Sequence, residues 1–374
     1  MRQFIALCLL TSVICWLPGS EAKAQQKPIP IEFFGLHIHR ADQGTAWPDI
    51  PFGSWRLWDA YVAWPSLEPN AGKWDFSRLD KYVRMAEQRG VSILLPLGLS
   101  PTWASARPNE HSSYRPGNAA EPRDLELWRN YVRTVARRYK GRILTYEIWN
   151  EPNLPSFYSG NIAMLVKLTQ VAREELRKVD PAIQLVSPSM STGGKSHIEY
   201  LDKFLAQGGA GLVDVIGYHL YVQNQSPEAL VPVVQDIRGV MKKHGLSSLP
   251  LWDTESGWWI ASSDGTPDHP SVSKGGWRKL GPEQAGEFLQ RTFLLSLSQG
   301  LGRVYWYAWD NYALGLIEPT TKNPKPVVEK WRSIVHDLLG ATNVSCAQAG
   351  NTWRCEYVRA GGTKEEISWT AATK

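Results

Sequence analysis

The sequence predicts a (β/α)8 TIM barrel, which is a fold of the α/β class. Apolar, β-rich runs alternate along the chain with amphipathic runs whose apolar residues recur every three or four positions, and we count eight of each. Such alternation is typical of parallel strands joined by helical crossovers. The length of 374 residues also fits one barrel with small additions.

The predicted strands are short runs rich in β-branched and aromatic residues. They cover residues 31–38, 54–59, 91–98, 143–150, 183–189, 213–221, 249–255 and 303–309. The clearest helices cover residues 76–90, 125–139, 163–179, 283–300 and 327–341, and glycine often follows them. Two connections between predicted strands lack a clear helical pattern. Residues 39–53 are rich in proline and glycine and predict a loop or a very short helix, and residues 267–282 predict a long loop.

The first 24 residues have the pattern of a secretory signal peptide. Arg2 precedes an apolar run from Phe4 to Leu17, and small residues follow up to Ala24. The apolar run is short for a bilayer span, which favours cleavage near Gln25 over the alternative, an uncleaved membrane anchor. We therefore expect a secreted or periplasmic protein that has no membrane contact after cleavage.

The barrel is expected to cover residues 25–340, and the pattern then changes. Residues 341–374 predict two or three short strands with glycine-containing turns, which would form a small β appendage. Cys346 and Cys355 are the only cysteines outside the signal segment, and in an exported protein they predict a disulfide. Two unpaired thiols are the alternative, and two cysteines alone make a poor metal site.

Charge and aromatic content narrow the class of ligand. The formal net charge of +5 is mild, and no basic tract is present, so we expect no nucleic-acid partner. The chain contains 18 tryptophans. Core packing explains any single one, but as a set they favour a carbohydrate ligand, because aromatic faces stack on the C–H faces of sugar rings. Nothing in the sequence requires a cofactor or more than a monomer.

Two glutamates fall where a barrel places its active site. Glu151 and Glu255 end the predicted fourth and seventh strands, and the carboxyl ends of barrel strands face the site. Alternation along the fourth strand puts Glu147, Trp149 and Glu151 on its inner face. Glu147 then lies one layer deeper, where we expect it to be the buried partner of a cation such as Arg56.

A pair of carboxylates is what cleavage of a glycosidic bond needs. One must be protonated to assist the leaving oxygen, and the other must be ionised to attack the anomeric carbon or to direct water to it. Glu151, flanked by Trp149 and Pro152, suits the acid/base role, whereas Glu255, in DTESGWW with hydroxyl donors nearby, suits the nucleophile. This mechanism predicts carboxyl groups about 5 to 5.5 Å apart.

These motifs resemble a known family. The runs YEIWNEPN and LWDTESGWW resemble the acid/base and nucleophile segments of the retaining barrel glycosidases of clan A. The stretches WPDIPFGSWRLWD, WASARPNE and RYKGRILTYEIWNEPN narrow the resemblance to glycoside hydrolase family 39, and within it to bacterial hydrolases of secreted polysaccharide. The resemblance implies that Glu151 is the acid/base, that Glu255 is the nucleophile and that Asn150 donates to the sugar 2-hydroxyl.

The same resemblance implies further substrate-binding residues. Arg56 would lie near the nucleophile, His219 and Tyr221 would line the sugar site with Tyr221 able to donate to Glu255, and Trp309 would form the floor of the cleavage subsite. For each of these residues, a role in the core is the alternative. His37 and His39 after the first strand are two more candidates for substrate contact.

Two rival functions remain. A metal-dependent amidohydrolase on the same fold would use His37, His39, His219 and Asp310, but it also needs a ligand after strand five, where VSPSMST contains no histidine, so we expect no metal. A catalytically silent carbohydrate-binding barrel is the other rival, and the presence of both glutamates argues against it.

Substrate and mode of action follow from the resemblance alone. Family members with xylosidase or iduronidase activity usually carry a larger β-sandwich, whereas only 34 residues follow Gly340 here. We therefore expect a retaining hydrolase of β-linked polysaccharide, a bacterial exopolysaccharide cleaved internally being favoured. An exo-acting β-xylosidase-like enzyme is the alternative, with plant xylan as the second substrate.

Overall fold

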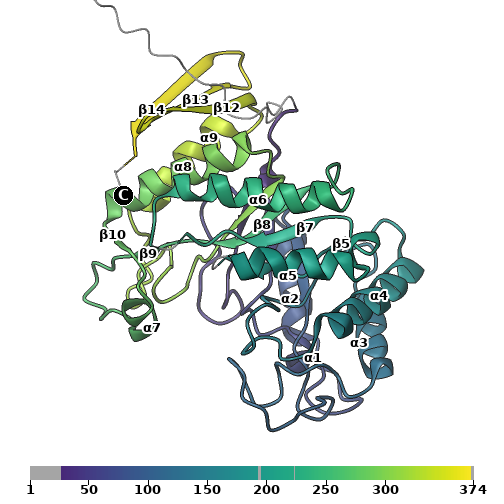
Figure 1. The fold of residues 1–374 in the computed structure, drawn as a ribbon. Helices are drawn as coiled ribbons and strands as arrows, with labels where there is room; N and C mark the ends of the chain where they lie inside the picture. Colours follow the sequence, from purple (N-terminus) through teal and green to yellow (C-terminus); the bar gives the residue numbers. More distant parts are fainter. Residues whose placement is uncertain (1–26, 193–194, 223, 372–374) are drawn as a thin grey trace, which may run out of the picture.

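Nine parallel strands form the central sheet of the protein (Figure 1). The structure is a computed structural model that describes residues 27–192, 195–222 and 224–371, so the predicted signal peptide, residues 1–24, lies outside the described residues. The strands are β1 (Phe34–Leu36), β2 (Ser54–Arg56), β3 (Ser92–Leu97), β4 (Thr145–Ile148), β5 (Gln184–Val186), β6 (Met190–Ser191), β7 (Ile216–His219), β8 (Leu251–Ser256) and β11 (Arg303–Trp306).

The sheet curls into a closed barrel. Its order is β5-β4-β3-β2-β1-β11-β8-β7-β6, so the first strand pairs with the last. β5 lies within the predicted fifth strand, residues 183–189, whereas β6 begins just after it, at Met190, and was not predicted. A parallel bridge between Val186 and Val215 joins the two ends of the sheet. The predicted (β/α)8 fold class is therefore confirmed.

Helices cover the outside of the strands (Figure 1). They are α1 (Trp64–Leu67), α2 (Ser77–Glu87), α3 (Leu125–Arg138), α4 (Ile162–Val179), α5 (Lys195–Ala206), α6 (Leu230–Lys243), α8 (Pro282–Ser298) and α9 (Val327–Leu338). The two helices α3 and α4 begin at side-chain caps, because Asp124 and Asn161 each accept a hydrogen bond from a backbone N–H of the first turn. None of the described helices is long and apolar enough to cross a membrane.

Two connections differ from the simple alternation. Residues 39–53 contain turns and no helix, so the count of eight helical runs was wrong for the first unit and its prediction as a loop is confirmed. The predicted long loop 267–282 instead contains the short helix α7 (Pro270–Lys274) and the strand β10 (Lys279–Leu280). β10 pairs with β9 (Trp259–Ile260), which gives this connection a small sheet of its own that the proline content did not predict.

The interior of the barrel has an apolar layer and a polar layer. Leu94, Val186, Val215, Trp252 and Tyr305 form a buried cluster that is separate from the main core. These residues come from strands on opposite sides of the barrel, and their side chains fill its interior. Nearer the carboxyl ends of the strands the interior becomes polar, and this is where the candidate site lies.

Three antiparallel strands follow the last helix. They are β12 (Thr342–Ala349), β13 (Thr352–Val358) and β14 (Lys364–Thr370), and β12 packs against α8 (Figure 1). Cys346 and Cys355 face each other across β12 and β13 and form the predicted disulfide, which is confirmed.

Candidate active site

Glu151 and Glu255 meet at the carboxyl ends of the barrel strands. Glu255 lies in β8, and Glu151 lies three residues after β4 with a positive φ of 45°. Each is only 7% exposed. One oxygen of Glu151, one oxygen of Glu255 and a ring nitrogen of His219 lie within 4.8 Å of one another. The two carboxylates are thus close enough to act on the same bond.

Arg56 organises the floor of this site. Its Nε donates to Glu147 Oε2 at 2.6 Å, its Nη1 to Glu255 Oε2 at 2.7 Å and its Nη2 to Asn150 Oδ1 at 2.7 Å. The pairing of Glu147 with Arg56 was predicted and is confirmed. Ser189 donates to the other oxygen of Glu147, so this fully buried carboxylate is satisfied on both sides.

The chain after β4 departs from the alternation that we assumed. Trp149 was predicted to face the barrel interior, but its φ is 57°, in the left-handed region. Its indole N–H donates to the Phe157 carbonyl at 2.7 Å, and its ring packs against Trp128 of α3. Trp149 therefore lies among the helices, and Asn150 takes the inward place beside Arg56. A change in backbone conformation at one residue reversed the side-chain pattern.

Two donors hold the Glu255 carboxylate. Tyr221 donates to Oε1 at 2.9 Å and Arg56 donates to Oε2 at 2.7 Å. Burial raises the pKa of Glu255 to about 7, while the Arg56 guanidinium opposes that rise. Hydrogen bonds from Tyr221 and Arg56 stabilise the ionised form of Glu255.

Glu151 has a less polar environment. Its Oε1 lies 3.0 Å from Nδ1 of His219, and burial raises its pKa. Burial also lowers the pKa of His219 to about 4, so the imidazole is neutral at pH 7. Glu255 thus receives the guanidinium and the phenol, whereas Glu151 contacts a neutral ring and the Ser191 hydroxyl.

The remaining candidates fall in different places. His37 is fully buried, and its Nε2 lies 3.1 Å from the Thr254 carbonyl oxygen. The backbone N–H of His39 donates to Asp310 at 2.8 Å, and both residues line a cleft next to the glutamate pair. Trp309, expected at the floor of the sugar site, is 5% exposed and packs against the apolar core. Tyr307, two residues earlier, lines the cleft.

The cleft has a volume of about 780 Å³ and is formed by the loops that follow β1, β2, β3 and β11. Aromatic side chains gather on it. The described chain exposes five large apolar or aromatic side chains, and three of them, Tyr61, Tyr114 and Tyr312, line this cleft. Exposed rings along a cleft are suited to stacking on successive sugar units.

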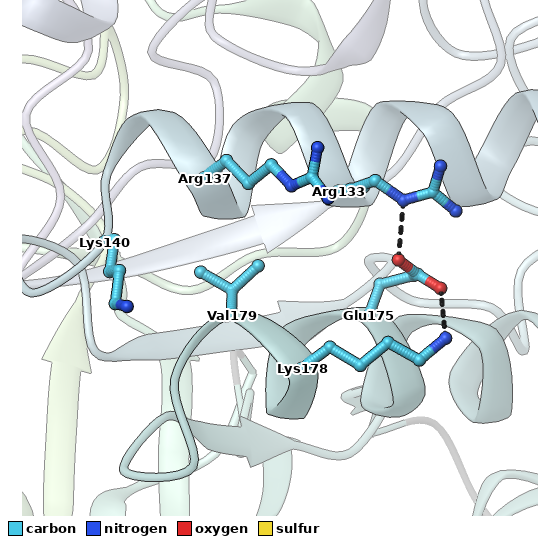
Figure 2. Close-up of a pocket in the computed structure, with 6 residues that line it drawn as sticks. All are labelled: Arg133, Arg137, Lys140, Glu175, Lys178 and Val179. Carbon is cyan, nitrogen blue, oxygen red and sulfur yellow. Dashed lines mark hydrogen bonds and ion pairs between the residues drawn. The ribbon is translucent and has the colours of Figure 1, made fainter.

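A second hollow lies between α3 and α4 and is lined mainly by charged residues (Figure 2). Arg133 and Lys178 both donate to the buried Glu175, at 2.8 and 2.9 Å. These residues lie in the C-terminal halves of the two helices, and so at the end of the barrel remote from Glu151 and Glu255. Cations near helix C-termini complement the helix dipole, so the charged residues that line this hollow are explained by their stabilising effect on the two helices.

The groups beside the two glutamates could in principle be ligands of a metal ion. Among the described residues, Glu151, His219 and Glu255 form the one group whose ligand atoms converge. Arg56 donates to Glu255 at 2.7 Å, and its fixed positive charge opposes a cation at this place. The set expected of an amidohydrolase is not among the converging groups of the described residues: of its four members only His219 belongs to such a group, and His37 contacts a backbone carbonyl.

Comparison with known proteins identifies the family. The family model described as glycosyl hydrolases family 39 matches residues 66–269, a segment that contains both glutamates. The chain belongs to glycosyl hydrolase family 39. Two curated relatives are a β-xylosidase from Geobacillus stearothermophilus, 24% identical over 206 residues, and an endo-1,4-β-xylanase from Agaricus bisporus, 27% identical over 154 residues. The matches cover 49% and 40% of this chain, but only 40% and 43% of those proteins.

Solved structures share the fold with this family 39 chain. A family 39 glycoside hydrolase from Bacteroides cellulosilyticus WH2 superposes with a TM-score of 0.69 at 20% identity, over 91% of this chain and 70% of that one. A monomeric β-xylosidase from Caulobacter crescentus CB15 gives 0.65 at 19% identity, over 90% and 75%. These likenesses support the barrel architecture.

Three cleft residues of this family 39 chain were missed by sequence reasoning: Asp59, Tyr114 and Tyr307. Asp59 ended the predicted second strand, so the rule that drew attention to Glu151 and Glu255 could also have found it. Tyr114 lies in the long loop between β3 and α3, where neither periodicity nor a strand end gives a signal.

Proposed function

We propose that this protein is a retaining glycoside hydrolase that cleaves β-linked polysaccharide by double displacement. The observation that carries the proposal is the approach of one oxygen of Glu151 and one of Glu255 to within 4.8 Å. Retaining enzymes hold the two carboxyl groups about 5 to 5.5 Å apart, whereas inverting enzymes separate them by about 6.5 to 9.5 Å to admit water.

In the first step, Glu255 attacks the anomeric carbon and forms a covalent glycosyl-enzyme, while Glu151 gives its proton to the leaving oxygen. In the second step, the Glu151 carboxylate takes a proton from water, the water oxygen attacks the anomeric carbon, and the bond to Glu255 breaks. Arg56 and Tyr221 orient the nucleophile. The side-chain oxygen Oδ1 of Asn150 accepts a hydrogen bond from Arg56. The side-chain amide N–H groups of Asn150 can therefore donate to the sugar 2-hydroxyl.

The cleft supports a polymeric substrate. Three exposed tyrosines along an open surface suit a run of sugar units and internal cleavage. We favour a bacterial exopolysaccharide, hydrolysed without a cofactor by a secreted or periplasmic monomer. The relatives include β-xylosidases as well as endo-xylanases, so exo cleavage of a β-xyloside is the second candidate.

The test is product analysis of the mature protein on a panel of β-linked polysaccharides that includes bacterial exopolysaccharides and xylan. Glu255→Gln is the inactive control. We expect oligosaccharides of several lengths that disappear with the control variant. Release of only monosaccharide from chain ends would replace the endo assignment by the exo one. Binding without cleavage by the unmutated protein would support the silent-barrel alternative and overturn the proposal.

A further inference from the structure

Asp59 is a third carboxylate at the mouth of the barrel, and the mechanism above gives it no role. It lies in the loop that follows β2 and lines the cleft together with Trp58 and Tyr61. Its φ is 54°, a left-handed conformation that residues other than glycine seldom adopt. Such a conformation persists only where the surrounding contacts hold it.

Two tyrosines provide those contacts. Tyr114 donates its hydroxyl to Asp59 Oδ1 at 2.7 Å, and Tyr307 donates to Oδ2 at 2.6 Å. Tyr114 belongs to the loop after β3 and Tyr307 follows β11, so the single carboxylate joins the loops of three strands. A phenol keeps its proton at neutral pH, so both tyrosines are donors.

Asp59 differs in its partners from the other carboxylates near the site. Within residues 27–192, 195–222 and 224–371, no arginine, lysine or histidine forms an ion pair with Asp59, in contrast to Glu147 and Glu255, which both contact Arg56. Asp310, the other acidic residue on the cleft wall, accepts hydrogen bonds from two backbone N–H groups and from the Thr45 hydroxyl. Asp59 is therefore the carboxylate of the cleft wall whose charge neutral phenols alone stabilise.

The chemistry of a ligand for such a group is restricted. An ionised carboxylate only accepts hydrogen bonds and has about four acceptor sites, of which the two phenols occupy two. The tyrosines fix its orientation, so the remaining sites are already aligned before a ligand binds. Hydroxyl and amino groups of a sugar can satisfy them, whereas a sugar carboxylate would meet the charges of Asp59 and the neighbouring Glu255.

We propose that Asp59 is a specificity-determining residue that accepts hydrogen bonds from a neutral or amino sugar unit in the cleft beside the cleaved bond and rejects a uronate unit there. The inference rests on the proposed glycoside hydrolase function and adds the class of sugar. A purely structural role, in which Asp59 only ties three loops together, is the competing explanation.

Two variants separate these explanations. Asp59→Asn keeps the size of the side chain but removes the charge and replaces one acceptor by a donor. Tyr307→Phe keeps the charge and removes one of the two hydrogen bonds to it. If Asp59 only ties loops, both variants disturb the cleft in the same way. If Asp59 selects the sugar, only Asp59→Asn changes the discrimination between neutral and acidic units.

The experiment measures binding by affinity electrophoresis in the Glu255→Gln background, so that no polymer is cleaved. The probes are β-glucan, β-mannan and β-galactan, each compared with the same polymer after oxidation of its C6 hydroxyls to carboxylates. We expect the parent to prefer at least one neutral polymer over its oxidised form by about tenfold or more. Asp59→Asn should reduce that ratio by about tenfold, while Tyr307→Phe should lower affinity for both forms and keep the ratio.

Asp236→Asn is the matched control, because Asp236 is an exposed residue of α6 on the outside of the barrel. The inference is overturned if Asp59→Asn leaves the ratio unchanged, if Tyr307→Phe changes it equally, or if no neutral polymer binds. If the unmutated protein cleaves a neutral polymer but Asp59→Asn leaves the ratio of neutral to oxidised binding unchanged, this inference is refuted and the proposed function stands. Absence of cleavage on the whole polysaccharide panel would instead overturn the proposed function.

Discussion

The hydrogen bond from Tyr221 to Glu255 gives the most specific prediction about pH dependence. Catalysis needs Glu255 in its ionised form, and burial raises the pKa of this carboxyl to about 7. The Tyr221 hydroxyl stabilises the ionised form through its 2.9 Å contact with Oε1. Replacing Tyr221 with phenylalanine therefore raises the pKa of Glu255 further, and the acid limb of the pH profile moves to higher pH.

The size of this effect follows from the nature of the bond. A hydrogen bond to a charged group contributes about 1.5 to 3 kcal/mol. At about 1.4 kcal/mol per pH unit, the acid limb should move upward by about one to two units. At a pH below the limb, kcat/KM should fall by about 10- to 150-fold, and the loss should become smaller as the pH rises and Glu255 ionises in both proteins.

The assay is the pH dependence of kcat/KM on a substrate that the unmutated protein cleaves. Tyr146→Phe serves as the control, because the Tyr146 hydroxyl is buried on β4 and has no hydrogen-bond partner among the described residues. Its profile should match that of the parent. An acid limb of Tyr221→Phe that stays in place or moves to lower pH would refute the assignment of Tyr221 as a donor to the ionised nucleophile.

Three further predictions concern the acid, the buried cation and the disulfide. Glu151→Ala should lose most activity on substrates with poor leaving groups and keep the first step on aryl glycosides with good ones, and equal loss on both in stopped-flow measurements would remove its acid role. Arg56→Met leaves the buried Glu147 carboxylate unpaired, so the free energy of unfolding in urea should fall by about 3 to 5 kcal/mol, and a loss below about 1 kcal/mol would contradict the geometry. The double variant Cys346→Ser, Cys355→Ser should lower stability by about 2 to 3 kcal/mol without changing kcat/KM, and equal stability of parent and variant under non-reducing conditions would argue against the bond.

Much of the fold could be predicted from the sequence because the barrel is built from repeated local patterns. The alternation of apolar and amphipathic runs depends on side chains that face the core, and it located every strand of the barrel except the two-residue β6. The first crossover was correctly suspected to lack a regular helix. The short helix and strand within residues 267–282 escaped prediction, since elements of two to five residues leave no periodicity in the sequence.

The site was readable where a charged residue ends an apolar strand. Glu151 and Glu255 fit that description, and the structure brings their side chains together beside Arg56. Trp149 was misplaced because it lies just past the end of β4, where the alternation of side chains no longer holds, and its φ is 57°.

The central claim is double displacement with Glu255 as the nucleophile, and the configuration of the first product tests it most directly. Proton NMR of the sugar released from a β-linked polysaccharide, recorded during the first minutes before mutarotation, distinguishes the two anomers. We expect the β-anomer to appear first, because two inversions at the anomeric carbon restore its configuration. Initial release of the α-anomer would show a single inversion and would contradict the roles assigned to Glu255 and Glu151.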